Sequence, residues 1–223
     1  MFNITKQEFV KRSGEALEGI WDWLEGLDTV SLDQLDSAHT ALFIIDMING
    51  FAREGALQSP RVEALIPEID RLLKLANKKG IKSLAFTDAH GNDSPEFESY
   101  PVHCVAGTSE AAMVREIAET GGYTQIPKNS TNAFHEEAFQ KWLKENPGIN
   151  TFIMTGDCTD ICIQQLAITL RTWFNQQNIK SRIIVPANAV DTYDLGLHQG
   201  DLVHAMALYN MSINGVEIVK AIV

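Results

Sequence analysis

The sequence predicts an α/β protein: an open, mostly parallel β-sheet flanked by helices on both faces, preceded by a helical segment. Two observations lead to this fold class. Short, wholly apolar segments alternate with longer segments whose apolar residues have helical spacing. The apolar segments also lack polar alternation, which is typical of strands buried on both faces of a parallel sheet. Right-handed crossovers between such strands place helices on both faces.

The first 40 residues are predicted to form a helical appendage to a main domain at residues 41–223. Thr5 and Glu8 match a capping box, and the helix that they begin is expected over residues 5–26. Its apolar stripe consists of Phe9, Leu17, Ile20, Trp21 and Leu24. Residues 28–37 are acidic and fit a short second helix. The segment either covers an edge of the core or contacts a neighbouring subunit, and we expect a homo-oligomer.

The main domain is predicted to alternate strand and helix to its end. Strands are expected at residues 41–46, 82–87, 123–126, 152–154, 182–185 and 216–219. Helices are expected at residues 61–79, 109–119, 135–145, 162–175 and 198–209. Gly80 ends the first of these helices, since glycine readily adopts the left-handed conformation that closes a helix. The long segment 89–108 is rich in turn-forming residues and is predicted to be a loop.

Composition indicates a globular protein and argues against two classes of partner. The chain has 223 residues, of which 45% are hydrophobic and 21% charged, as expected for one domain with a sizeable core. A net charge of −11 argues against nucleic acid and anionic membranes as partners. No run approaches the roughly 18 apolar residues of a transmembrane helix. The N-terminus lacks signal-peptide features and the three cysteines form no disulfide framework, so we expect the cytoplasm.

Polar, reactive residues follow the predicted strands. Asp46, Asp88 and Lys128 come at or just past three strand ends, and a turn leads from a fourth strand to Cys162. The carboxyl ends of parallel strands meet at one edge, where such sheets bind ligands. A cysteine in the first helical turn gains thiolate character, and the backbone N–H groups there can face an oxyanion. The alternative for Cys162 is a small buried hydrophobic residue.

Asp46, Lys128 and Cys162 together suggest nucleophilic catalysis. A thiol becomes a nucleophile when a base takes its proton, and a nearby cation lowers its pKa. Asp46 fits the base and Lys128 fits the cation. Taken singly, Asp46 could be a turn cap and Lys128 a surface lysine.

The loop after the second strand carries a possible metal site. Asp88-Ala-His90, with His103 further along, offers carboxylate and imidazole ligands that suit one divalent ion, with Zn²⁺ expected and Fe or Mn as alternatives. Glu96 is a possible fourth ligand, with Asp93 and Glu98 as competitors. The alternative is a solvated loop that happens to carry two histidines.

Three motifs of the main domain together resemble the isochorismatase-like cysteine hydrolases over roughly residues 41–220. They are Ile45-Asp46 with the loop through Phe51 to Gly55-Ala-Leu57, Lys128-Asn-Ser-Thr-Asn-Ala-Phe134, and Thr155-Gly-Asp-Cys-Thr-Asp-Ile-Cys162. Thr87-Asp-Ala-His90 followed by Tyr100-Pro-Val-His-Cys-Val-Ala-Gly-Thr108 resembles the metal loop of the nicotinamidase branch. The resemblance implies a Rossmann-like, three-layer fold.

The resemblance also implies roles for individual residues. Cys162 would be the nucleophile, Asp46 the general base and Lys128 the cation that steadies both. The oxyanion hole would use the backbone N–H groups of Cys158 and Cys162, shaped by a cis peptide between Asp157 and Cys158. The metal would be held by Asp88, His90, His103 and Glu96 and would bind the pyridine nitrogen of the substrate, and Phe51 would border its ring.

The implied activity is that of a nicotinamidase, which converts nicotinamide to nicotinate and ammonia in NAD salvage. The chain departs from the family pattern at Met47-Ile-Asn-Gly50, at Ala89 and at Asp157. One alternative is therefore another amide or carbamoyl hydrolase of the superfamily, and a second is a non-catalytic binding protein on the same fold.

Overall fold

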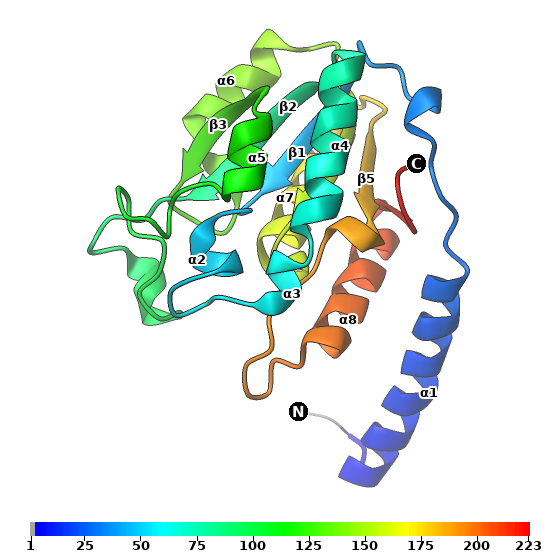
Figure 1. Ribbon diagram of the computed structural model, residues 1–223. Helices are drawn as coiled ribbons and strands as arrows, with labels where there is room; N and C mark the ends of the chain where they lie inside the picture. The colour runs from blue at the N-terminus through cyan, green and yellow to red at the C-terminus, as the bar shows by residue number, and fades with distance from the viewer. Residues whose placement is uncertain (1–2) are drawn as a thin grey trace.

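The computed structural model describes residues 3–223 and has the predicted α/β fold (Figure 1). Its strands are β1 (Thr40–Ile45), β2 (Lys82–Asp88), β3 (Tyr123–Lys128), β4 (Thr151–Gly156), β5 (Arg182–Pro186) and β6 (Glu217–Val219). They form one sheet in the order β3-β2-β1-β4-β5-β6, and every neighbouring pair is parallel. The chain adds β2 and β3 on one side of β1 and then β4, β5 and β6 on its other side. In open parallel sheets, ligands bind at the carboxyl ends of the two strands where the side changes, here β1 and β4.

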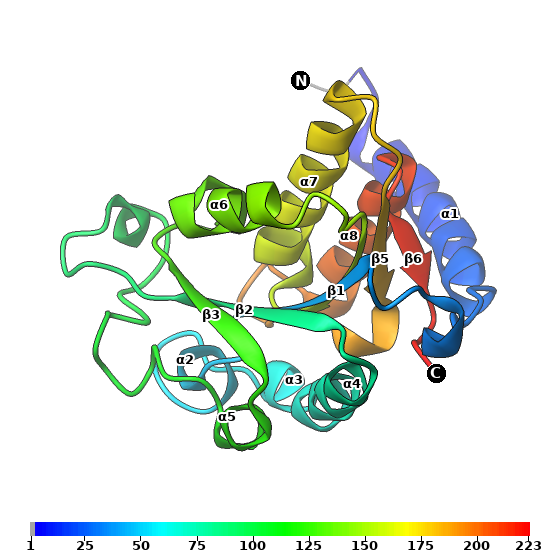
Figure 2. The ribbon, with the colours of Figure 1, turned by 90° about the horizontal axis from the view of Figure 1, so that it is seen from above.

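Helices cover both faces of the sheet, as Figure 2 shows: α6, α7 and α8 lie on one face, and α2 to α5 lie on the other. The α-helices are α1 (Lys6–Glu25), α2 (Asn49–Ala52), α3 (Pro60–Glu63), α4 (Ile66–Lys79), α5 (Arg115–Thr120), α6 (Glu137–Glu145), α7 (Gln164–Gln176) and α8 (Gly200–Ile213). Short 3₁₀ turns are η1 (Leu32–Gln34), η2 (Pro95–Glu98), η3 (Ala133–His135) and η5 (Ala187–Ala189), and η4 (Thr159–Ile163) is a π-helical turn.

Each face of the sheet supports its own hydrophobic core. Alternate side chains of β1 point to opposite faces: Leu42 and Ile44 join the core beneath α4, whereas Phe43 joins the core beneath α6 and α7. Phe43 makes edge-to-face contacts with Phe86 and Phe139, with ring centroids 5.3 and 5.5 Å apart. The six residues of β1 are all buried, as the apolar run predicts.

Two predicted helices differ from the structure for identifiable reasons. The helix expected at residues 61–79 is divided into α3 and α4, because Pro67 has no N–H to continue the helical hydrogen bonds across the junction. The helix expected at residues 109–119 begins only at Arg115. The preceding backbone instead bonds to the segment after β1, through Gly50 N–H to the Glu110 carbonyl and Val114 N–H to the Met47 carbonyl.

The N-terminal helix α1 packs against α8 at the β6 side of the molecule (Figures 1 and 2). Thr5 caps it as predicted, accepting a hydrogen bond from Glu8 N–H at 3.2 Å. Ile20 is buried and the Trp23 ring meets Tyr209 at 6.0 Å, whereas Phe9 and Trp21 of the predicted apolar stripe are 43% and 60% exposed. Residues 28–32 then bond to the backbone of residues 220–223.

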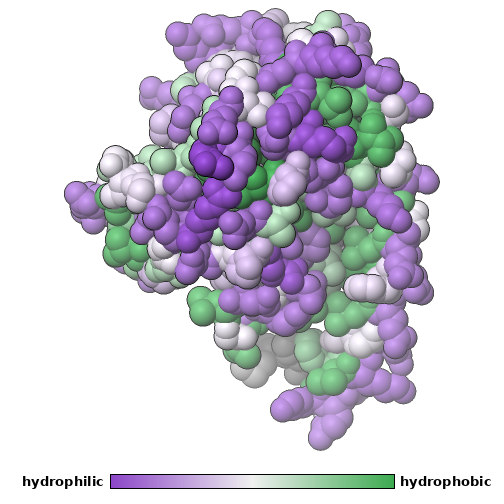
Figure 3. All heavy atoms as spheres, in the orientation of Figure 1, coloured by the Kyte–Doolittle hydropathy of each residue, from purple (hydrophilic) through white to green (hydrophobic). Residues whose placement is uncertain are grey.

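The face that carries α4 and α5 is mostly hydrophilic (Figure 3).

Among residues 3–223, none of the helices has both the length and the apolar character that crossing a bilayer requires.

Candidate active site

Four strand ends bring the predicted catalytic residues together at one edge of the sheet. Asp46 directly follows β1, Asp88 and Lys128 are the last residues of the paired strands β2 and β3, and η4 follows β4 and carries Cys162. All four side chains are buried. The edge therefore holds a cluster of buried ionisable groups. Charged side chains are rarely buried for packing alone.

Lys128 lies at the centre of this cluster. Its Nζ is 2.8 Å from Asp46 Oδ2, contacts Asp88 Oδ1 and is 3.6 Å from Cys162 Sγ. Asp46, which has a left-handed φ of 55°, also accepts the Asp88 N–H at 2.9 Å through Oδ1. The Cys162 sulfur and the nearest oxygens of Asp46 and Asp88 lie within 4.8 Å of one another. The predicted base and cation therefore both adjoin the predicted nucleophile.

Burial and the neighbouring charges act against each other on the pKa values of Asp46, Lys128 and Asp88. Burial, reinforced by the nearby Asp88 charge, raises the pKa of Asp46 to about 7 despite Lys128. Burial alone would lower the pKa of Lys128, but the negative charges of Asp46 and Asp88 outweigh it and raise that pKa. Lys128 in turn holds the pKa of Asp88 below its usual value against the effect of burial.

The thiol differs from the expectation that helix position would favour the thiolate. Burial is the largest influence on Cys162 and raises its pKa well above the usual value, with Lys128 opposing this shift. Cys162 lies in the π-helical turn before α7 rather than in the first turn of an ordinary helix. A resting thiol in this position depends on an adjacent base for activation, and Asp46 is that neighbour.

The turn between β4 and η4 carries Cys158 and leads to Cys162, the two residues predicted for the oxyanion hole. The Asp157–Cys158 peptide bond is cis, as the family resemblance implies. Within the turn, Ile161 and Ile163 N–H groups bond to the Cys158 carbonyl, and the Thr159 N–H bonds to the Asp191 carbonyl. Cys158 and Cys162 both border the pocket described below.

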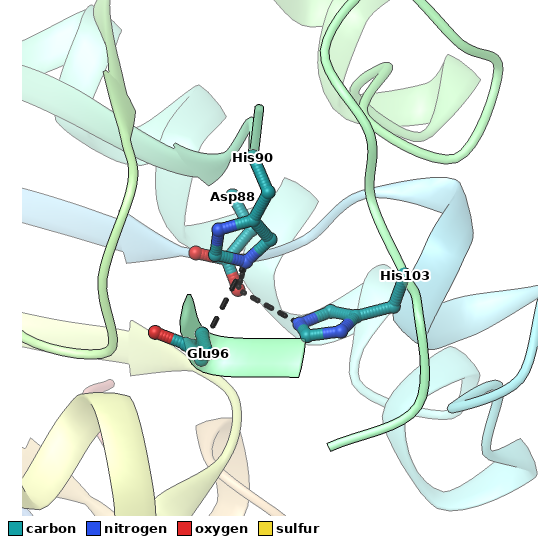
Figure 4. Close-up of side chains that lie close together, drawn as sticks. All are labelled: Asp88, His90, Glu96 and His103. Atoms are coloured by element: carbon teal, nitrogen blue, oxygen red, sulfur yellow. Dashed lines mark ion pairs between the residues drawn. The ribbon is translucent and has the colours of Figure 1, made fainter. Parts of the chain in front are cut away.

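A second cluster lies beside the first (Figure 4) and consists of Asp88, His90, Glu96 and His103. His90 Nε2 lies 3.5 Å from Asp88 Oδ2 and 3.7 Å from Glu96 Oε1, and His103 Nε2 lies 3.9 Å from Asp88 Oδ2. His90 Nε2 is buried and has no hydrogen-bond partner. The two histidines are oriented by their other nitrogens, which face Asn129 Oδ1 at 3.3 Å and the Pro101 carbonyl at 2.8 Å.

These distances suit a metal ion better than direct hydrogen bonds. Two ligands with bonds of about 2.1 Å to a tetrahedral Zn²⁺ stand about 3.4 Å apart. The separations of 3.5–3.9 Å are near this spacing and exceed hydrogen-bond length. The Nδ1 contact of His103 with a carbonyl is the outer support that metal-binding histidines usually have. The four residues present therefore fit a divalent ion, with Glu96 among them rather than Asp93 or Glu98.

Both clusters open onto one pocket. The Phe51 ring lies in its wall, 5.6 Å from the His103 ring, as expected for a residue that borders the substrate. The pocket is lined by Phe51, Leu57, Asp88, Glu96, Tyr100, His103, Thr131, Cys158, Ile161, Cys162 and Tyr193. Tyr193 was not predicted, because it lies in a loop where no spacing pattern marks it. Thr131 lies within the motif at residues 128–134, but no role was predicted for it. Unlike Cys158 and Cys162, Cys104 does not line the pocket and belongs to the hydrophobic core beneath α4.

The family of the chain follows from these features together with a direct comparison. A model of the family described as the isochorismatase domain matches residues 40–217. The chain therefore belongs to the isochorismatase family of hydrolases.

Two similar proteins are named as nicotinamidases, one of them as inactive. Nicotinamidase 1 of Arabidopsis thaliana is 26% identical over 210 residues, which cover 81% of this chain and 85% of the relative. A probable inactive nicotinamidase of the same plant is 28% identical over 139 residues, covering 57% of this chain and 70% of the relative.

Solved structures share the fold. The pyrazinamidase of Pyrococcus horikoshii, solved in complex with zinc, superimposes with a TM-score of 0.68 at 23% identity and covers 82% of this chain and 99% of its own. The N-carbamoylsarcosine amidase of Thermoplasma acidophilum superimposes with a TM-score of 0.67 at 22% identity and covers 81% and 95% of the two chains.

Proposed function

We propose that this protein is a nicotinamidase, a metal-assisted cysteine amidohydrolase that forms nicotinate and ammonia from nicotinamide. The observation that carries the proposal is that one pocket is bordered both by Cys162 and by three of the four donor residues, Asp88, Glu96 and His103. A planar ring held at the cluster has its carboxamide beside the thiol. The names of the Arabidopsis nicotinamidase and the zinc-bound pyrazinamidase support the same reaction class.

The reaction begins with transfer of the Cys162 thiol proton to Asp46. Burial raises the pKa of Asp46 to about 7, which suits a base that works near neutral pH. Lys128, with its Nζ 3.6 Å from the sulfur, stabilises the thiolate as it forms. The thiolate then attacks the carboxamide carbon.

The carbonyl oxygen gains negative charge in this step and is stabilised by the N–H groups of Cys158 and Cys162. Asp46 returns the proton to the amide nitrogen, the C–N bond breaks, and ammonia leaves a thioester on Cys162. Water, deprotonated by Asp46, attacks the thioester and the C–S bond breaks. Asp46 returns that proton to the Cys162 sulfur, and the acid loses its own proton to solvent and leaves as nicotinate.

Asp88, His90, Glu96 and His103 would hold the divalent ion. When bound, the ion supplies a Lewis-acid contact for the pyridine nitrogen and so fixes the ring in the pocket. Asp88 links the two clusters, since Oδ1 contacts Lys128 and Oδ2 faces the histidines. The protein thereby aligns ring and nucleophile before reaction.

The test is ammonia release from nicotinamide by the purified protein, before chelation, after chelation and after metal is added back. We expect turnover that chelation abolishes and metal restores, with nicotinate as the second product. If metal-loaded protein releases no ammonia from nicotinamide, the substrate assignment is wrong.

A second candidate is a different amide or carbamoyl hydrolase of the family. It is favoured by Ala89 and Asp157, at which the chain departs from the expected pattern, and by the fold shared with N-carbamoylsarcosine amidase. Turnover of a carbamoyl substrate that survives chelation would support this candidate over the first. The third candidate is a non-catalytic binding protein on the same fold. It would be supported if the metal-loaded protein hydrolysed none of a panel of amides.

A further inference from the structure

The connection between β5 and α8 is bound to the catalytic turn. In Figure 1 it is the orange loop that hangs below the body next to α8. Arg61 anchors its beginning, with Nη2 2.8 Å from Asp191 Oδ1 and Nε 3.1 Å from the Thr192 carbonyl. The Asp191 carbonyl accepts the Thr159 N–H at 3.0 Å. The loop is therefore tied to η4 before it reaches the pocket.

Tyr193, the next residue of the loop, forms part of the pocket wall. Its ring stacks on that of His198, with centroids 4.1 Å apart and planes only 10° from parallel. The tip of the loop beyond it is solvent-exposed, with Leu195 at 60% and Leu197 fully exposed. Tyr193 thus faces the substrate pocket on one side and depends on His198 for support on the other.

His198 is held by contacts on both sides of its ring. Nδ1 lies 2.9 Å from the Tyr193 carbonyl, and Nε2 lies 2.8 Å from Asp160 Oδ2. Its backbone exchanges two hydrogen bonds with Leu195, at 2.9 and 3.0 Å, which close the loop. Asp160 belongs to η4, between Cys158 and Cys162. His198 consequently links the Tyr193 wall to the turn that carries the nucleophile.

We propose that His198 is a positioning residue that holds Tyr193 against the pocket and thereby makes the site selective for flat aromatic carboxamides. The selectivity rests on the proposed nicotinamidase function, because it concerns the ring of that substrate. A wall that is ordered before binding does not lose side-chain freedom when the ring arrives, so preorganisation favours a flat ligand. His198 itself does not line the pocket.

The kinetic test compares His198→Ala with Leu197→Ser, a control on the same loop. We expect His198→Ala to raise KM for nicotinamide about 5- to 10-fold with little change in kcat, the scale of ordering one side chain. Leu197→Ser should match the wild type. Tyr193→Ala should raise KM equally, and the double variant no further, because both remove one wall. An unchanged KM in His198→Ala, or effects that multiply in the double variant, would overturn the selectivity role.

A measurement without substrate separates this inference from the proposed function. Amide hydrogen exchange at residues 193–199 should be at least about tenfold faster in His198→Ala than in the wild type or Leu197→Ser, because this part of the loop loses the bond from His198 to Asp160 of η4. Unchanged exchange overturns the positioning role whatever the substrate is. Faster exchange in a protein that does not hydrolyse nicotinamide leaves the positioning role intact and rejects the function. His198→Gln, which keeps a polar group but no stacking ring, gives the same expected result if His198→Ala fails to fold.

Discussion

Lys128 is a fully buried lysine that faces several acidic groups. Its Nζ contacts the carboxylates of Asp46 and Asp88 and adjoins the Cys162 sulfur. A buried ion is tolerated when its charge is matched, and removal of one partner leaves the others uncompensated. At the residue scale, the cluster therefore works as a unit in which each group sets the protonation of its neighbours.

Cys162→Ala should lower the rate of ammonia release by at least about 10⁴-fold, as removal of a nucleophile does in other hydrolases. Metal content should not change, because the donor cluster does not include the thiol. Cys104→Ala is the matched control and should retain activity, since Cys104 belongs to the hydrophobic core and does not line the pocket. Turnover in Cys162→Ala would refute the nucleophile assignment.

Asp157 is a buried carboxyl group whose two oxygens have no hydrogen-bond partner. Burial raises its pKa well above the usual value. We expect Asp157→Val to increase the free energy of unfolding by about 1–3 kcal/mol at pH 7, the cost of an unsatisfied buried polar group. Urea titrations would measure the change, with the exposed Asp22→Val as the control.

The pH dependence of this gain has a definite sign. The folded state keeps a proton on Asp157 that the unfolded chain loses above about pH 4, so the stability contributed by that proton falls as pH rises. The gain from Asp157→Val should therefore be smaller at pH 4 than at pH 7. A gain that is larger at the lower pH would contradict a protonated Asp157.

At the scale of elements, the crossing from β4 into η4 depends on a close approach of two strands. Gly156 has a φ of 112°, and a Cβ at this position would lie 1.9 Å from the Ile45 carbonyl oxygen. Only glycine combines this conformation with this contact. The carboxyl ends of β1 and β4, and with them Asp46 and Cys162, can consequently stand side by side.

Gly156→Ala should lower the free energy of unfolding by about 2 kcal/mol or more, because both the φ value and the contact are unfavourable for alanine. Gly19→Ala is the matched control: it lies in α1 with no atom near the added Cβ and should stabilise by about 0.5–1 kcal/mol. Chemical unfolding of both variants measures the difference. Equal stability of the two would show that β1 and β4 can separate freely.

The end of β2 and the loop after it carry the proposed metal donors. His90→Ala should lower the metal content of purified protein at least about tenfold, because loss even of an outer partner weakens metal affinity 10- to 100-fold. His135→Ala, an exposed histidine of η3, is the control and should bind metal like the wild type. Elemental analysis of both proteins decides the question, and full occupancy in His90→Ala would exclude this residue as a ligand.

At the scale of the whole molecule, α1 packs against α8, and none of its residues lines the pocket. Deletion of residues 1–26 should lower Tm by at least about 5 °C, because it removes the buried Ile20 and the Trp23 contact with Tyr209. Ammonia release at a temperature where the shortened chain is folded should be unchanged. Lost turnover in a folded protein would instead place α1 at the active site, for example through a neighbouring subunit.

The sequence was sufficient to predict the positions of the strands and which polar residues follow their ends. An apolar run such as residues 41–45 can be accommodated only where both faces are covered, and polar residues at the ends of parallel strands must share an edge. Asp46, Lys128, Cys162 and the donors around His90 were therefore expected together, and the structure brings them together.

What only the tertiary structure decided depends on contacts between segments far apart in the chain. The backbone near Glu110 bonds to Gly50 instead of continuing a helix, and Tyr193 lines the pocket from a loop whose His198 bonds to Asp160. The raised pKa of Cys162 likewise comes from burial by the whole fold. Periodicity reports only local preferences, whereas these features are fixed by partners that the chain brings near after folding.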